Sequence, residues 1–153
     1  MKPTGWFQVA WSADVKPGQV LPIEYFDRKL VVWRDDDGAT HVNDAFCPHL
    51  GAHFGYGGQV QGDDLICPFH GWRFNAEGHN TLIPYSDRIN KKACVESLPV
   101  TEANGLIMAW YHPEGAEPMD IEDLYERLAD TGLEYGPAFQ GLTAAWRDGE
   151  DTY

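Results

Sequence analysis

Basic residues are scarce in this chain of 153 residues, which has 11 lysines and arginines against 24 aspartates and glutamates, a formal net charge of −13. Nucleic acids and anionic membranes are bound through basic surface, so this balance argues against both as partners. No apolar run approaches the roughly 18 residues of a transmembrane helix. The N-terminus also lacks the apolar core of a signal peptide. We therefore expect a globular protein without a membrane span.

Cysteine is also rare, and two of the three cysteines lie in matching motifs, Cys47-Pro48-His49 and Cys67-Pro68-Phe69-His70. Thiolates are soft ligands and imidazoles intermediate ones, so two such Cys-His pairs predict a centre holding zinc or an iron–sulfur cluster. Zinc sites with two Cys and two His usually place like ligands together in the sequence. One Cys and one His in each motif instead favours a [2Fe–2S] cluster with two Cys on one iron and two His on the other.

The two motifs and their flanks, Cys47-Pro-His49-Leu-Gly51-Ala and Cys67-Pro-Phe-His70-Gly71-Trp72-Arg-Phe, resemble the cluster-binding loops of Rieske proteins. More narrowly, the chain from about residue 5 to about residue 119 resembles the N-terminal domain of the Rieske non-haem iron oxygenases. The resemblance implies a mostly β fold of antiparallel sheets with two cluster-binding loops. It also implies a Rieske [2Fe–2S] cofactor bound by Cys47, His49, Cys67 and His70. A zinc-stabilised binding module without a redox role is the alternative from another class.

The local patterns agree with an all-β arrangement of short strands separated by turns. A continuous apolar run at 30–33 is typical of a strand that is covered on both faces. Asn104-Gly105 is a strong signal for a two-residue hairpin turn. Within a predicted loop at 81–92, Ile83-Pro84-Tyr85 is a candidate third loop over the cluster. The predicted strands are 6–11, 19–26, 29–34, 40–43, 59–61, 65–66, 95–102 and 106–110.

The motifs lack two features of the respiratory Rieske proteins. Those proteins carry a further Cys in each loop, and the two form a disulfide; here the places are taken by Ala52 or His53 and by Phe69. A Ser that donates to a bridging sulfide in those proteins is replaced by Trp72, a candidate cluster shield or an ordinary core residue. Fewer donors leave the reduced state less stabilised, so we expect a low potential. We interpret His53 as a loop residue rather than an extra ligand.

With Cys47 and Cys67 assigned to the centre, only Cys94 remains, and no internal disulfide is expected. This favours the reducing cytoplasm, with Cys94 as a small buried hydrophobe.

No histidine follows His112, so a second iron site with two His and one carboxylate is not expected in this chain. We therefore expect an electron carrier that does not hydroxylate substrates alone. Its expected donor is a reductase or ferredoxin, and its expected acceptor is a non-haem iron site elsewhere. A self-standing Rieske ferredoxin is the alternative.

Residues 120–153 are a different kind of sequence, with nine acidic and two basic residues. A helix is predicted at 120–130 and a strand at 143–149. Tyr135-Gly136-Pro137-x-Phe139 resembles the start of the second half of a polyketide synthase dehydratase domain. We expect a Rieske domain at 5–119 and a C-terminal extension at 120–153, left by a fusion or truncation and without dehydratase activity. A polyketide-pathway protein is one alternative, and an ordinary helix and strand packed on the domain is another.

Overall fold

The computed structural model describes residues 4–118, 147–148 and 151–152. Three antiparallel sheets and one short hairpin account for all its strands there, which confirms the mostly β prediction. The sheets have the strand orders β1-β11-β10, β2-β3-β4-β9 and β5-β6-β7-β8, and the hairpin pairs β12 with β13. The strands are β1 (Gly5–Trp11), β2 (Val20–Tyr25), β3 (Arg28–Arg34), β4 (Thr40–Asp44), β5 (Gln59–Gln61), β6 (Asp64–Ile66), β7 (Arg73–Phe74), β8 (Asn80–Leu82), β9 (Ser97–Leu98), β10 (Val100–Ala103), β11 (Leu106–Tyr111), β12 (Arg147–Asp148) and β13 (Asp151–Thr152), with a 3₁₀ turn at Ser12–Asp14.

Strand β3 lies between the two hydrophobic cores of the domain. Its residues Leu30, Val31, Val32 and Trp33 are all fully buried. Because side chains alternate along a strand, Leu30 and Val32 join a core formed with β1 and β11, while Val31 and Trp33 join a core formed with Cys47 and Cys67. The apolar run therefore is a strand covered on both faces, as predicted.

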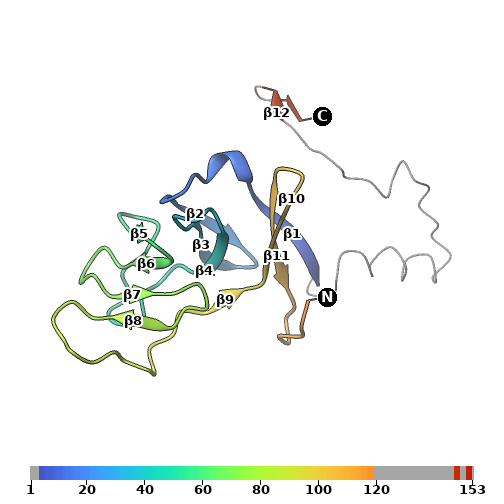
Figure 1. Ribbon diagram of the computed structural model, residues 1–153. Coiled ribbons are helices and arrows are strands. Elements are labelled where there is room, and N and C mark those ends of the chain that lie inside the picture. The colour runs from blue at the N-terminus through green and yellow to red at the C-terminus, as the bar shows by residue number, and fades with distance from the viewer. Residues whose placement is uncertain (1–3, 119–146, 149–150, 153) are drawn as a thin grey trace.

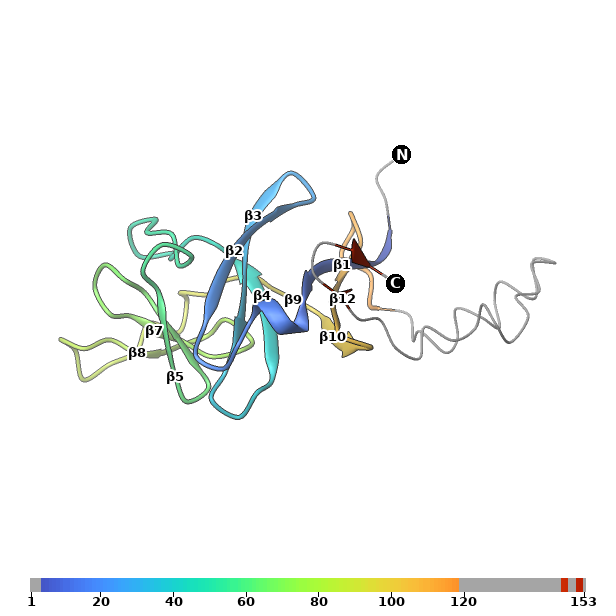
Figure 2. The same ribbon diagram turned by 90° about the horizontal axis from the view of Figure 1, so that it is seen from above.

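The two views of the fold agree on the order of the sheets. The β5–β8 sheet lies at one end, the β1-β11-β10 sheet lies at the other, and β2–β4 lie between them (Figures 1 and 2). Phe54, Leu65 and Phe74 fill the core on the β5–β8 side. Both cysteine motifs thus belong to the end of the molecule that contains the β5–β8 sheet.

The strand predicted at 95–102 is divided in the structure. Strand β9 pairs with β4, whereas β10 pairs with β11, so the chain changes sheets at Pro99. Proline has no N–H to donate to a ladder, although its carbonyl still accepts from the Trp110 amide at 2.9 Å. The hairpin between β10 and β11 turns at Asn104 and Gly105, both at positive φ, as the sequence predicts.

Cys94 is exposed, and its prediction as a buried hydrophobe was wrong. Its neighbours Ala93 and Val95 are both buried. In extended backbone, successive side chains point to opposite faces. Cys94 lies between two buried residues, so its side chain faces outward. The helix predicted at 120–130 lies outside the described residues, and of the strand predicted at 143–149 only Arg147 and Asp148 are described. Among the described residues no helix is long and apolar enough to cross a membrane.

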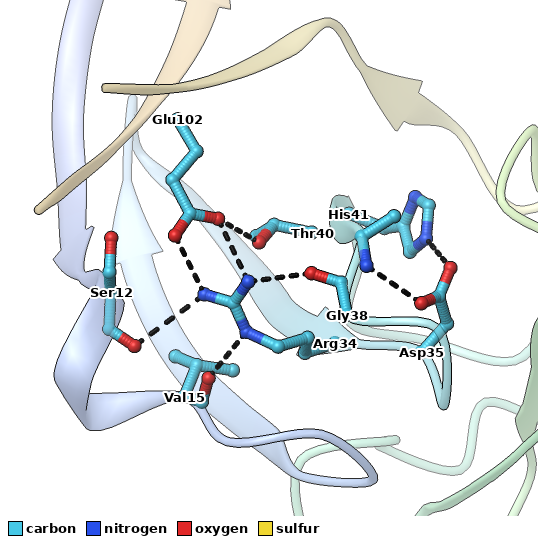
Figure 3. A network of polar contacts seen from close by, with 9 residues as sticks. Ser12, Val15, Arg34, Asp35, Gly38, Thr40, His41 and Glu102 are labelled. Carbon is cyan, nitrogen blue, oxygen red and sulfur yellow. Dashed lines mark hydrogen bonds and ion pairs between the residues drawn. The ribbon is translucent and has the colours of Figure 1, made fainter. Parts of the chain in front are cut away.

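Arg34 joins the two sheets that meet at β3 and β10 (Figure 3). Its guanidinium donates two hydrogen bonds of 3.0 Å to the carboxylate of Glu102, which lies 68 residues away in the sequence. It also donates to the carbonyls of Val15 and Gly38, each at 2.7 Å. Burial alone would raise the pKa of Glu102, but hydrogen bonds from Arg34 and Thr40 outweigh it and hold that pKa below its ordinary value. Arg34 and Glu102 therefore connect the two sheets through charge-assisted hydrogen bonds.

We predict that Arg34→Met destabilises the domain far more than Arg28→Met. Arg34 is 11% exposed, and its loss leaves the carbonyls of Val15 and Gly38 without this donor and Glu102 without its charged partner, although Thr40 still donates to Glu102. Losing these charge-assisted hydrogen bonds should cost about 2–3 kcal/mol. Arg28 is 27% exposed and pairs with Asp44 and with the more open Glu96, so its loss should cost about 1 kcal/mol. Urea denaturation followed by tryptophan fluorescence measures both free energies of unfolding. Equal losses for the two variants would contradict the prediction.

Candidate metal centre

The two cysteine motifs adopt the same hydrogen-bonded loop. In the first, the Cys47 amide donates to the Ala52 carbonyl at 2.9 Å, and the Gly51 amide donates to the Cys47 carbonyl at 2.9 Å. In the second, the Cys67 amide donates to the Trp72 carbonyl at 2.8 Å, and the Gly71 amide donates to the Cys67 carbonyl at 3.0 Å. Gly51 and Gly71 both have positive φ, which explains why each motif needs glycine at this place.

The thiols of Cys47 and Cys67 lie together in the core. The two residues are 1% and 2% exposed, and both pack in the core that contains Trp33 and Phe54. Burial, and to a smaller extent the neighbouring thiol of Cys67, raises the pKa of Cys47 to about 12. Without a metal, the Cys47 thiol is therefore protonated at neutral pH. Binding of a metal as thiolate requires release of that proton, which couples metal affinity to pH.

His49 and His70 form the other half of the site. Their rings lie 4.8 Å apart between centroids and meet edge to face at 68°. Both residues are half-buried, yet the Nδ1 atom of each ring is fully buried and has no hydrogen-bond partner. Buried polar atoms are normally paired, so two unpaired imidazole nitrogens at one place fit the donors of a metal-binding site.

The four predicted site residues are thus brought together as two pairs. Two thiols and two imidazole nitrogens match the donor set of a Rieske cluster, in which each iron takes one pair. Within the described part of the chain, no three His, Cys, Asp or Glu side chains are placed to hold a single ion. A cluster that spreads its ligands over two irons does not need such a grouping.

Trp72 is both a core residue and a cover for the site. It is 7% exposed, and its ring stacks on the His49 ring at 4.4 Å with only 7° between the planes. Its indole N–H donates to the Tyr85 hydroxyl at 2.6 Å. Trp72 therefore matches both sequence interpretations, since the same side chain is a core residue and covers His49.

The third loop lies against the second motif. Ile83 is buried in the same core as Cys67, and a Cβ on Gly71 would come within 3.0 Å of the Pro84 ring. The sequence identified this loop as a candidate but gave no sign of the Tyr85 hydrogen bond. That bond joins residues 13 positions apart, and only the folded loop brings them together.

His53 belongs to the wall of the first loop. Its Nδ1 accepts a hydrogen bond from the Gly55 amide at 3.0 Å, and its ring packs against Phe46 and Tyr56. This nitrogen is occupied by backbone, unlike the corresponding atoms of His49 and His70. Nearby at the loop tips, Leu50, Tyr56 and Phe69 are largely exposed.

Comparison with known proteins decides the family. Residues 5–99 match the model of the Rieske [2Fe-2S] domain. The chain belongs to the Rieske [2Fe–2S] family. Its cofactor is accordingly a Rieske-type [2Fe–2S] cluster, and the zinc alternative is set aside.

Oxygenases and desaturases are among the similar proteins. The Rieske chain is 44% identical over 131 residues to cholesterol 7-desaturase nvd of Bombyx mori, covering 85% of this chain and 29% of that protein. It is 36% identical over 114 residues to the oxygenase component of 3-ketosteroid-9-alpha-monooxygenase of Rhodococcus rhodochrous, covering 74% and 30% respectively. The crystal structure of dicamba monooxygenase matches with a TM-score of 0.65 and 26% identity, over 76% of this chain and 37% of that one. The chain therefore spans less than a third of the curated relatives it matches here.

A second family model matches the end of the chain. Residues 111–153 match the polyketide synthase dehydratase N-terminal domain. This confirms that the tail of the Rieske chain resembles a dehydratase fragment. The match is to the N-terminal domain of the dehydratase, whereas the Tyr135 motif predicts the start of its second half.

We predict that Cys94 is the one rapidly reactive thiol of the native protein. Cys94 is exposed, whereas Cys47 and Cys67 are almost fully buried and the pKa of Cys47 is raised. Ellman's reagent should therefore titrate one thiol per chain at pH 8 in the folded protein and three after unfolding with the cluster removed. Cys94→Ser should abolish the fast reaction, and fast reaction of that variant would contradict the assignment.

Proposed function

We propose that this domain transfers single electrons through its [2Fe–2S] cluster, with Cys47 and Cys67 on one iron and His49 and His70 on the other. The observation that carries this proposal is the pair of buried Nδ1 atoms without protein partners, beside two adjoining buried thiols. The bound cluster supplies one-electron chemistry. The chain supplies four donors on matching loops, an apolar core around the sulfurs, and two half-buried rings that reach toward the surface.

We assign the domain the role of electron entry in a Rieske-type oxygenase system. It takes an electron from a reductase or ferredoxin and passes it to a mononuclear non-haem iron. The similarity to an oxygenase component and to desaturases supports this role. Since the sequence has no histidine beyond His112, an iron site with two His and one carboxylate would come from polypeptide outside it. This chain alone should therefore not hydroxylate a substrate.

We also propose that the functional unit is residues 5–119 and that 120–153 is an extension. Strand β11, which completes the first sheet, ends at Tyr111, and the dehydratase match begins there. The extension is also the more acidic part, with nine acids and two bases in 34 residues. A cytoplasmic location fits a chain whose only cysteine outside the centre is Cys94.

Replacing a proposed ligand should remove the cluster, and replacing the neighbouring histidine should not. We expect His70→Ala to lose the red-brown colour and the iron, because one iron then keeps a single protein ligand. His53→Ala should keep two irons per chain, because His53 Nδ1 already accepts from the Gly55 amide. Visible absorption together with iron analysis measures both. A coloured His70→Ala with two irons, or a colourless His53→Ala, would refute the ligand assignment.

The potential should lie near the low end of the Rieske range, at about −150 mV. Two ferric ions, two sulfides and two thiolates sum to zero charge, so reduction leaves one negative charge in an apolar core. Trp72 stands where respiratory Rieske proteins place a donating Ser, and its N–H is directed to Tyr85 instead. Fewer hydrogen-bond donors therefore point at the cluster sulfurs to stabilise the added negative charge. A mediated redox titration that returned a strongly positive potential would contradict this.

A further inference from the structure

An open groove of about 740 Å³ lies directly beside the metal centre. Trp72 and Ile83 form its apolar floor, and the segment from Asp87 to Lys92 forms its rim. Trp72 is also the ring that stacks on His49 at 4.4 Å. A single side chain thus separates the surface of the groove from a proposed cluster ligand.

The rim of this groove is basic in a strongly acidic protein. Residues 1–119 contain fifteen acids and nine bases, yet Arg88, Lys91 and Lys92 stand within five positions of one another. All three are exposed, and Asp87 is the only acid among the groove residues. The ion pairs within the described ranges use Arg28, Arg34 and His41, and none involves these three cations. Their charge is therefore available to a partner.

The groove differs from the other exposed surface near the site. The loop tips present Leu50, Tyr56 and Phe69, which are apolar or aromatic, and neither Lys nor Arg stands in the loops 45–58 and 67–72. Burial and the charge of Lys29 lower the pKa of His53, so one cation stands near the first loop. Three cations stand together in the loop at 81–92, beside Trp72. A partner that is recognised by charge would therefore approach over Trp72 rather than over the tips.

We propose that this groove is the docking site for the acidic face of a protein electron donor, a carboxylate-rich [2Fe–2S] ferredoxin or ferredoxin domain. The inference rests on the electron-transfer function proposed above and specifies where the electron enters. One electron leaves the reduced donor cluster and reduces the cluster of this domain, and no bond is formed or broken. Plant-type ferredoxins have lower potentials than Rieske centres, so the transfer runs downhill. Trp72 and His49, with ring centroids 4.4 Å apart, provide a direct contact between the groove and a proposed cluster ligand.

The charge distribution favours a protein over a membrane as the acidic partner. An extended anionic surface would be repelled by the net charge of −13 on the whole chain. A small carboxylate patch contacts the basic rim alone, since charges farther than about 8 Å are screened at physiological salt. The basic rim of this acidic protein therefore favours a partner protein with a small acidic patch over an extended anionic membrane.

The test compares Lys91→Glu with Lys16→Glu, using a dithionite-reduced plant-type ferredoxin as the probe. Both lysines are exposed, both changes alter the charge equally, and Lys16 lies in the turn before β2, outside the groove. Stopped-flow reduction at low ionic strength should be about 5–10-fold slower for Lys91→Glu and less than about twofold slower for Lys16→Glu. The triple variant Arg88→Glu/Lys91→Glu/Lys92→Glu should be about 100-fold slower, with a rate that no longer falls as salt is added.

Binding gives an independent readout that does not depend on turnover. Titration of the oxidised ferredoxin by calorimetry should give an affinity that is weakened by Lys91→Glu and left unchanged by Lys16→Glu. Unchanged absorption spectra and potentials of the variants will show that their clusters are intact. Vesicles containing phosphatidylserine serve as the second probe, and they should bind neither the wild type nor the variants.

The outcomes separate this inference from the function on which it rests. A wild-type protein that cannot be reduced even by photoreduced deazaflavin would overturn the electron-transfer function. A wild-type protein that is reduced by deazaflavin but not by ferredoxin, or in which Lys91→Glu and Lys16→Glu behave alike, would overturn the docking site alone. Loss of vesicle binding in the triple variant with unchanged ferredoxin binding would assign the groove to a membrane and overturn the proposal as well.

Discussion

Two loops of the same shape bring two thiols into one apolar core and two half-buried imidazoles next to each other, and the rest of the domain depends on that constraint. Each loop is closed by one hydrogen bond to the Cys amide and one to the Cys carbonyl, with a glycine at positive φ. The sheets supply the surroundings, since Val31 and Trp33 of β3 pack against the same core as Cys47 and Cys67. Without a bound group, this arrangement leaves two buried nitrogens unpaired, which is unfavourable. The fold therefore has a defined place for a cluster that satisfies them.

The parts of this arrangement that sequence reasoning predicted are those with a local signal. The ligand types, their order and their spacing are visible in the sequence, as are the apolar run of β3 and the Asn104-Gly105 turn. Each of these depends on residues a few positions apart. The family model and the sheets confirm the Rieske identification and the β class.

The parts that escaped prediction depend on contacts between distant segments. Arg34 and Glu102 are 68 residues apart, and nothing in either neighbourhood predicts their ion pair. The chain changes sheets at Pro99, which has no N–H for a ladder, whereas the residues that flank it favour a strand. Residue type alone predicts a buried Cys94, but its exposure follows from its place between the buried Ala93 and Val95. Residue type gave the chemistry, but the register of the chain decided which side chains face inward.

The surface around the centre is divided between two kinds of side chain, and this division has a physical consequence. The tips of the two cysteine loops expose Leu50, Tyr56 and Phe69, while the loop at 81–92 exposes Arg88, Lys91 and Lys92. An apolar surface contributes affinity when a partner covers it and excludes water. A charged rim instead raises the association rate, and this effect weakens as salt is added. On the function proposed above, the domain meets one partner that donates an electron and another that accepts it. A donor recognised by charge at Arg88, Lys91 and Lys92 and an acceptor recognised by shape at the loop tips would contact different residues, so the two would not compete for one surface.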